Sequence, residues 1–244
     1  MSEIAKLRAI MAPTGVLRTT INVGNPILAG IEASQDQPYG VSVDLAKLIA
    51  KRLEVELELQ VYPTAGEAVA VVSDEKADMG FFAVDPKRGE HIQFTAPYVL
   101  IEGCYLVRDD SPITTQEEVD RSGQRIVVGK GSAYDLYLSR TIEQAELVRA
   151  PTSPKVVEFF REHQLDIAAG VKQQLEVGIE EFAGMRLLPG HFMMIQQAMG
   201  VPKARAPEAA AFLSAFIEEV KASGEVARLL EKHGIKGASV APSA

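Results

Sequence analysis

The chain has 244 residues, enough for one large or two small domains, and 47% of them are hydrophobic and 24% charged. This composition is typical of globular proteins and excludes the disordered and fibrous classes. The net charge of −8, without a basic cluster along the sequence, argues against a nucleic-acid partner.

Cysteine and histidine usage limits the chemistry further. The single cysteine, Cys104, cannot form an intramolecular disulfide. The four histidines show no metal-ligand spacing: His91, His163, His191 and His233. We therefore expect neither a metal nor a cofactor.

The N-terminal segment, MSEIAKLRAIMAPTGVLR, lacks the apolar core of a secretory signal and carries Glu3. No stretch approaches the ~20 apolar residues of a membrane span. Two alternatives remain open at this point. Either a signal has been removed, or the protein stays in the cytoplasm.

Hydrophobic periodicity predicts an alternation of strands and helices over the first hundred residues. The run VELELQVY alternates apolar and polar residues strictly, as a half-buried strand does, whereas 41–53 places its apolar residues on one helical face. The predicted elements are strands at 17–23, 55–62 and 79–84 and helices at 41–53 and 65–74. This order is typical of a sheet with parallel strands and covering helices.

The pattern then restarts in a second α/β unit. Thr115 and Glu118 have the spacing of a capping box. The predicted elements are strands at 98–108, 125–129, 147–150, 165–171, 185–190 and 192–203, and helices after Gly131, at 154–163 and within 207–233. No flexible linker separates the units, so we expect the joints within the two long strands, near 102–105 and 193–197.

Several motifs, in order and spacing, resemble those of one family. They are GVSVDLAKLIAKRL, EKADMGFF, DPKRGEHIQFTAPY, VVGKGSAYDLYL and EHQLDIAAGV. The chain resembles the type II periplasmic solute-binding proteins, specifically the polar amino-acid-binding branch of ABC importers. The resemblance implies an α/β fold of two lobes, each a mixed sheet flanked by helices, joined by two hinge strands. We expect residues 1–103 plus 195–244 in lobe one and 104–194 in lobe two.

Arg88 follows the apolar run FFAV in the turn DPKR. Taken alone, such an arginine is a solvated turn charge, and we keep that interpretation for Lys87. The resemblance implies another role for Arg88, because the family's arginine in this turn grips the carboxylate of the ligand. A guanidinium suits the task, since its planar fork of donors fits a carboxylate bidentately.

The turn GKGSAYDL offers a second anion contact. Ser132 stands at the N-cap position, and the N–H groups around Gly131, Ser132 and Ala133 open a helix whose positive end attracts anions. A plain serine cap explains the same residues. Opposite Arg88, as the resemblance implies, this turn becomes a carboxylate contact. A phosphate loop is not expected, because GxxxxGK[ST] is absent.

The sequence departs from the family pattern at four positions. Amino-acid binders have aromatic residues where this chain has Asn25 and Ala65, and a hydroxyl residue where it has Ala83. Their second lobe supplies an aspartate for the α-ammonium where Val171 stands here. A buried ammonium without a counter-charge is costly. We therefore expect the carboxylate site to be kept and the ammonium site to be lost.

Three further residues have alternative interpretations. Phe81 and Phe82 either line the pocket or pack in the sheet core. Lys172 either replaces the aspartate's charge by the opposite sign or is an exposed loop lysine. Glu102 is the nearest acidic residue that could still hold an ammonium.

These features predict a solute-binding protein and not an enzyme. The expected ligand is a small carboxylate, amino-acid-like or an organic acid, closed between two lobes. The resemblance implies a periplasmic receptor, monomeric, that serves an ABC transporter permease. One alternative is a cytoplasmic orphan binding or sensor protein of the same fold. The other is a cyclohexadienyl-dehydratase-like enzyme, which needs a proton donor that neither Asp85 in its turn nor Asp135 within a helix supplies.

Overall fold

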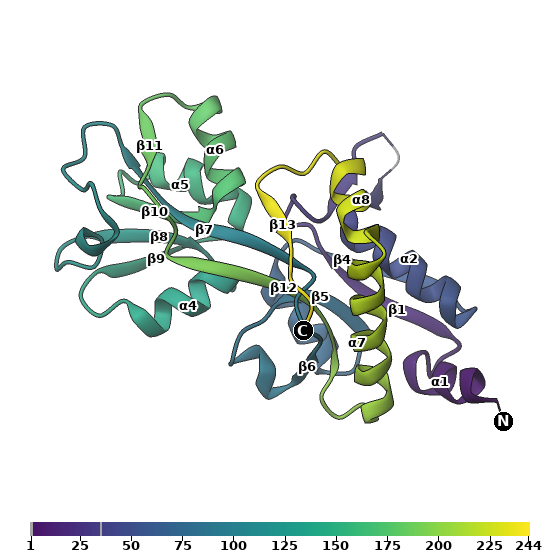
Figure 1. Ribbon diagram of the computed structural model, residues 1–244. Coiled ribbons are helices and arrows are strands. Elements are labelled where there is room, and N and C mark those ends of the chain that lie inside the picture. The colour runs from purple at the N-terminus through teal and green to yellow at the C-terminus, as the bar shows by residue number, and fades with distance from the viewer. Residues whose placement is uncertain (1, 35) are drawn as a thin grey trace. The chain divides into compact units, whose positions relative to one another are not determined.

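The computed structural model describes residues 2–34 and 36–244. The chain divides into two compact units, the first reaching Leu100 and resuming at Gln196–Ala244, the second formed by Ile101–Ile195. Two strands, β7 (Val99–Arg108) and β12 (Met193–Pro202), run from one unit into the other (Figure 1). The predicted architecture of two α/β units joined by two strands is confirmed.

The first unit holds a mixed sheet in the order β4-β1-β5-β12. Strand β1 pairs with β4 and β5 in parallel, whereas β12 pairs with β5 and β6 antiparallel. Its elements are α1 (Glu3–Met11), β1 (Val16–Asn22), β2 (Gly30–Glu32), β3 (Gln37–Tyr39), α2 (Val41–Leu53), β4 (Glu56–Tyr62), α3 (Ala65–Ser73), β5 (Met79–Ala83), η1 (Arg88–Glu90), β6 (Ile92–Phe94), α7 (Pro207–Ala222), α8 (Glu225–Lys232) and β13 (Ala238–Val240).

Helix α2 spans the residues that the apolar pattern predicts, because one face carries the buried Val41, Leu45, Ile49 and Leu53. Gly40 precedes it at φ 119°, where a Cβ would lie 2.4 Å from the carbonyl oxygen of Leu28. Only glycine fits this tight entry into the helix.

The second unit holds the sheet order β7-β10-β8-β9, in which β10, β8 and β9 are parallel and β7 is antiparallel to β10. Helices α5 and α6 cover the face where Cys104, Leu106, Val157, Phe160 and Leu175 form the core. The remaining elements are η2 (Gln116–Glu118), β8 (Arg125–Gly129), α4 (Ala133–Thr141), β9 (Glu146–Ala150), η3 (Ser153–Lys155), α5 (Val156–Glu162), β10 (Ile167–Val171), α6 (Lys172–Glu181) and β11 (Met185–Leu187).

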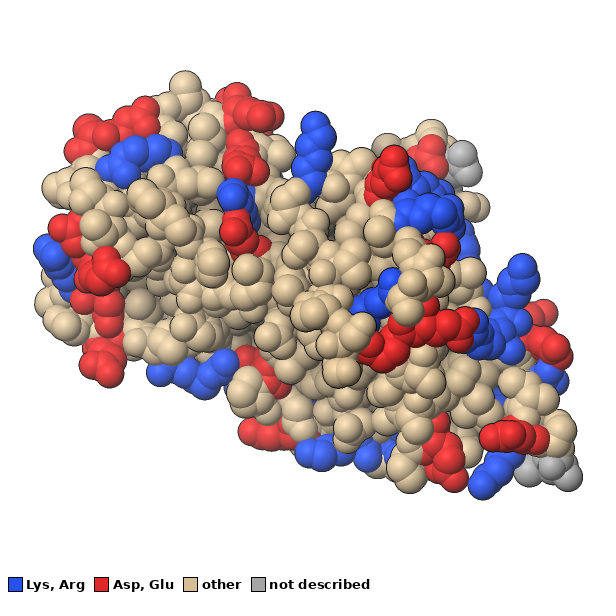
Figure 2. Space-filling view, in the orientation of Figure 1, with Lys and Arg blue, Asp and Glu red and all other residues tan. Residues whose placement is uncertain are grey.

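Two surface properties bear on function. Within residues 2–34 and 36–244, no helix combines the length and the apolar character needed to cross a bilayer. On the face drawn in Figure 2, lysine and arginine side chains alternate with aspartate and glutamate and form no broad patch of one sign. That face offers little to attract a polyanion.

Candidate ligand-binding site

The first unit gathers its predicted site residues at one edge of its sheet. Strands β1, β4 and β5 are parallel, and the register pairs Asn22 with Tyr62 at the carboxyl ends of β1 and β4. The turns after these three strands carry Asn25, Ala65 and Arg88 in that order. Carboxyl ends of parallel strands meet at one edge, which is where open α/β sheets bind ligands.

Arg88 is the first residue of η1 and is only 5% exposed. Its Nη1 donates to the carbonyl oxygen of Ala83 at 3.0 Å, which fixes the guanidinium against the end of β5. Burial lowers the pKa of Arg88 to about 10, and the charge of Asp85 acts in the opposite direction. The guanidinium is therefore still cationic at neutral pH. A buried, positioned cation of this kind is suited to binding an anion.

Asp85 organises the turn that carries Arg88. Its Oδ1 accepts from the backbone N–H of Lys87 at 2.8 Å, as the aspartate of an Asx-turn does. The carboxylate is 4% exposed. Lys87 itself is exposed, as the sequence predicts for a solvated turn charge.

The two phenylalanines of β5 point to opposite faces of the sheet, because strand side chains alternate. Phe82 packs in a cluster with Ala68, Val72 and Ile92. Phe81 meets the ring of Tyr98 edge to face, with centroids 6.3 Å apart. Both are buried. The contact of either ring with a ligand stays a prediction.

The two positions where the resemblance predicts aromatic residues carry small or polar groups. Ala65 is the half-buried first residue of α3, and Thr64 caps that helix by accepting from the N–H of Glu67 at 3.2 Å. Asn25 is half-buried, and its carbonyl accepts from the N–H groups of Leu28 and Ala29. Neither position offers a π face to a ligand.

The second unit has an equivalent edge, since β8, β9 and β10 are parallel. The turn after β8 carries Gly131 and Ser132, and the end of β10 is Val171, followed directly by Lys172. The sequence predictions for this unit thus fall at the carboxyl ends of neighbouring parallel strands.

Ser132 is the N-cap of α4 and is 6% exposed, and its Oγ accepts from the N–H of Asp135 at 3.0 Å. Gly131 adopts φ +72°. Among the residues that the structure describes, the N–H groups of Ala133 and Tyr134 have no acceptor. First-turn N–H groups lack intrahelical acceptors, so these two donors are open to water or to a ligand.

Asp135 holds this turn in shape, a role that the sequence interpretation missed. Its Oδ2 accepts from the N–H of Gly131 at 2.8 Å, and its Oδ1 accepts from Arg149 Nε at 3.0 Å and from Ser139 Oγ at 3.2 Å. The Asp135 side chain is 6% exposed. The only available signal was an aspartate at the third helical position, and its arginine partner on β9 was not recognisable from spacing.

The end of β10 presents no carboxylate. Val171 is 6% exposed, pairs with Gly103 of β7, and precedes α6 without a side-chain cap. Lys172 belongs to the first turn of α6, so its interpretation as an exposed loop lysine is wrong. Its Nζ lies 2.6 Å from Glu102 Oε2, and this hydrogen bond is the main cause that raises the pKa of Lys172. His191 Nδ1 lies 3.6 Å from the other oxygen of Glu102.

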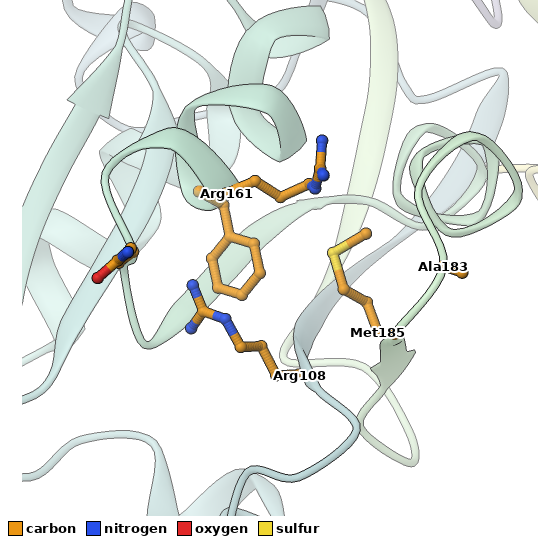
Figure 3. Close-up of a pocket in the computed structure, with 7 residues that line it drawn as sticks. Arg108, Arg161, Ala183 and Met185 are labelled. Atoms are coloured by element: carbon orange, nitrogen blue, oxygen red, sulfur yellow. The ribbon is translucent and has the colours of Figure 1, made fainter.

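A separate cavity of about 560 Å³ opens elsewhere in the second unit, lined by Arg108, Phe160, Arg161 and Met185 among others (Figure 3). The guanidinium of Arg108 lies 4.6 Å from the ring centre of Phe160 and donates to the carbonyl of Leu165 at 2.6 Å. Because β7 is antiparallel to β10, Arg108 lies toward the amino end of β10. This cavity is therefore not at the carboxyl edge that carries the predicted site.

No group of three or more histidine, cysteine, aspartate or glutamate side chains within the described parts of the chain is arranged to hold a metal ion. Cys104 is buried, and burial raises the pKa of its thiol to about 11. Its Sγ donates to the carbonyl of Gly190 at 3.4 Å. A thiol with a raised pKa is a poor nucleophile.

Three solved structures show the same fold at low sequence identity. A mutant of ArgBP from T. maritima has a TM-score of 0.78 and 21% identity, covering 96% of this chain and 99% of its own. A cysteine-binding protein from Campylobacter jejuni has a TM-score of 0.78 and 18% identity, covering 96% and 93%. An ancestral amino-acid-binding protein, a precursor of cyclohexadienyl dehydratase, has a TM-score of 0.77 and 19% identity, covering 95% and 100%.

No curated protein matches the chain in sequence. The family model of the bacterial extracellular solute-binding proteins, family 3, matches residues 24–236, which include every element from the turn after β1 to the end of α8. The chain belongs to family 3 of the bacterial extracellular solute-binding proteins.

Proposed function

We propose that the protein binds a small carboxylate-bearing solute between two lobes that close on it, the lobes being the two units Met1–Leu100 with Gln196–Ala244 and Ile101–Ile195. In this proposal Arg88 binds the carboxylate from lobe one. The N–H groups of Ala133 and Tyr134 at the start of α4, directly after Gly131 and Ser132, bind it from lobe two. The observation that carries the proposal is Arg88 itself, a buried guanidinium fixed by the Ala83 carbonyl at a carboxyl sheet edge.

The ligand lacks a conventionally held α-ammonium. Val171 offers methyl groups where a carboxylate would be needed, and Lys172 next to it adds a cation that is already paired with Glu102. An ammonium brought to this place would lose its hydration without gaining a counter-charge. An organic or aromatic acid meets no such cost.

Membership of the family supports a role as the receptor of an ABC importer. We propose that the protein acts in the periplasm, as a monomer, and delivers its ligand to a transporter permease. A binding protein needs no reactive group, and the two buried acids closest in sequence to the anion contacts are both engaged. Asp85 accepts from Lys87, and Asp135 accepts from Gly131 and Arg149. We therefore propose binding without catalysis.

A thermal-shift screen tests the proposal. The panel contains amino acids, oxo acids, dicarboxylates and aromatic acids, each measured with the wild type and with Arg88→Ala. A true ligand stabilises the folded protein by RT ln(1 + [L]/Kd), about 2.7 kcal/mol at a hundredfold excess over Kd. A carboxylate that stabilises the wild type and not the variant supports the proposal. Equal stabilisation of the wild type and of Arg88→Ala by every acid that binds contradicts it.

A further inference from the structure

The turn after β1 contains a buried hydrogen-bond acceptor without a partner. Asn25 Oδ1 is shielded from solvent and accepts no hydrogen bond from any of residues 2–34 and 36–244. The backbone of Asn25 is fixed at the same time, because its carbonyl accepts from Leu28 N at 3.0 Å and Ala29 N at 3.1 Å. An unpaired buried acceptor costs free energy, so Asn25 Oδ1 requires a donor that these residues do not supply, from water or from a ligand.

Three other uncharged side chains of the first unit also have unpartnered buried oxygens, but they differ from Asn25 in access. Thr19, Thr20 and Tyr98 are at most 1% exposed and lie within strands or directly before one. Asn25 is half-buried and lies in a turn, so a rotation of its side chain is enough to bring the shielded Oδ1 to a ligand. Among these four, only Asn25 can bind a ligand without opening the core.

Asn25 and Arg88 share one edge of one sheet. Asn25 follows β1 and Arg88 follows β5, and these two strands are parallel neighbours in which Thr20 pairs with Gly80. The edge thus offers a buried cation from one turn and a neutral acceptor from the adjacent turn. A carboxamide oxygen satisfies an O–H or N–H donor but cannot balance a full positive charge.

We propose that Asn25 Oδ1 accepts a hydrogen bond from a neutral donor of the ligand, a hydroxyl or an amide N–H, while the ligand's carboxylate binds Arg88. The ligand class is then a hydroxycarboxylate or an N-acylated or amidated acid, and not a simple fatty acid, an oxo acid or an amino acid. This inference rests on the proposed function, because it assumes that Arg88 binds a carboxylate.

Calorimetry with matched ligand sets provides the test. Each set keeps one skeleton and changes one group: succinate, malate, oxaloacetate, succinamate and aspartate in the first; 3-phenylpropanoate, 3-phenyllactate, phenylpyruvate, N-acetylphenylalanine and phenylalanine in the second. In at least one set, the hydroxyl or amide member should bind about tenfold or more tightly than the deoxy and oxo members, because only it satisfies Asn25.

Two variants separate Asn25 from the rest of the site. Asn25→Ala should bind the hydroxyl, amide and deoxy members of that set with equal affinity. Asn25→Leu, which keeps the side-chain volume without polar atoms, should do the same if the alanine variant folds poorly. Ligand-free unfolding temperatures identify a variant that fails to fold. Arg88→Ala should weaken every member of the set.

The outcomes distinguish this inference from the proposed function. If acids bind through Arg88 but the deoxy or oxo members bind as tightly as the hydroxyl and amide members, Asn25 recognises no donor and the inference fails alone. Retention of the preference in both Asn25 variants overturns it as well. If Arg88→Ala leaves binding of all acids unchanged, or no acid binds the wild type, the proposed function fails and the inference with it.

Discussion

Lys172 Nζ lies 2.6 Å from Glu102 Oε2, across the pairing of β10 with β7 that brings Val171 opposite Gly103. The charge of Lys172, which follows Val171, is therefore balanced by Glu102 within the second unit. This pair explains how the chain tolerates a cation beside Val171. It also removes Lys172 as a second anion anchor, since its charge is already balanced.

The first prediction concerns this pair. Lys172→Met should leave carboxylate affinity within about threefold and change the free energy of unfolding by no more than about 1 kcal/mol, because half-exposed ion pairs contribute little. Calorimetry and urea unfolding measure the two effects. Lys47→Met, on the exposed side of α2, controls for the loss of one positive charge. A tenfold loss of affinity in Lys172→Met alone would show that Lys172 contacts the ligand.

Arg88→Ala should weaken carboxylate binding by about 2–5 kcal/mol, the usual cost of removing one partner of a buried charge pair. Arg88→Lys should also bind weakly, because an ammonium lacks the planar fork. The neighbouring variant Lys87→Ala removes an exposed charge from the same turn and should bind normally. Calorimetry measures all three, and an affinity within about threefold of wild type for Arg88→Ala means that the anchor is misassigned.

The pKa of Arg88, lowered by burial to about 10, predicts a pH dependence. Carboxylate affinity should be constant from neutral pH and fall as the pH rises through about 10, because the guanidinium then loses its charge. The stability of the folded protein should change in the opposite direction to ligand affinity. The folded state releases this proton at a lower pH than the unfolded state does, so the contribution of Arg88 to the free energy of unfolding should increase above about pH 10.

The measurement is a pair of alkaline titrations that compare the wild type with Arg88→Met. Calorimetry reports ligand affinity, and urea unfolding without ligand reports stability. The difference between the two proteins isolates this group from the lysines and tyrosines that titrate in the same range. A difference in stability that stays constant with pH would contradict the lowered pKa.

Ser132→Ala removes the cap of α4 and should cost about 0.5–2 kcal/mol of stability. It should also weaken carboxylate binding, because the first turn of α4 loses its fixed geometry. Ser2→Ala serves as the matched control, since Ser2 caps α1 by accepting from Ala5 N at 3.3 Å. Helix α1 precedes the amino end of β1, whereas the candidate site lies at the carboxyl ends of the strands. If both variants bind ligand normally, the start of α4 is not an anion contact.

Periodic segments of the fold were predictable from the sequence, and segments without a local signal were not. Helix α2 begins at Val41 and ends at Leu53 as predicted, because its apolar face and Gly40 mark it clearly. Helix α6 was missed. It begins directly after β10 with Val171 in the cap position, so neither a capping residue nor a turn separates the strand from the helix. Helix α1 has only one buried residue, Met11, and hence no apolar stripe.

The predicted site divides in the same way. Residues at the ends of strands and helices, such as Arg88 after β5 and Ser132 before α4, could be predicted from turn and cap patterns together with the family resemblance. Pairings between distant residues do not. Glu102 with Lys172 and Arg149 with Asp135 depend on which strands lie side by side. The unpartnered oxygen of Asn25 likewise appears only when every neighbouring donor has a position.

Val171→Asp tests the absence of an ammonium site. Val171 is the N-cap of α6 and has an extended backbone with ψ 129°, where aspartate is among the preferred caps, so the variant should fold. Lys172 is already paired with Glu102, which leaves the new carboxylate available for a ligand.

The expected result is a gain of amino-acid binding that the wild type lacks. An α-ammonium at this place would then meet a carboxylate instead of methyl groups, and the cost of its desolvation would be offset. Calorimetry against the twenty amino acids and their deaminated analogues measures the change, with Val171→Asn as the uncharged control of nearly the same shape. Micromolar or tighter binding of a standard amino acid by the wild type, with the matching oxo acid much weaker, would show instead that an ammonium site exists without Val171. Glu102 would then be the first carboxylate to replace by mutation, because it is hydrogen-bonded to Lys172, the residue directly after Val171.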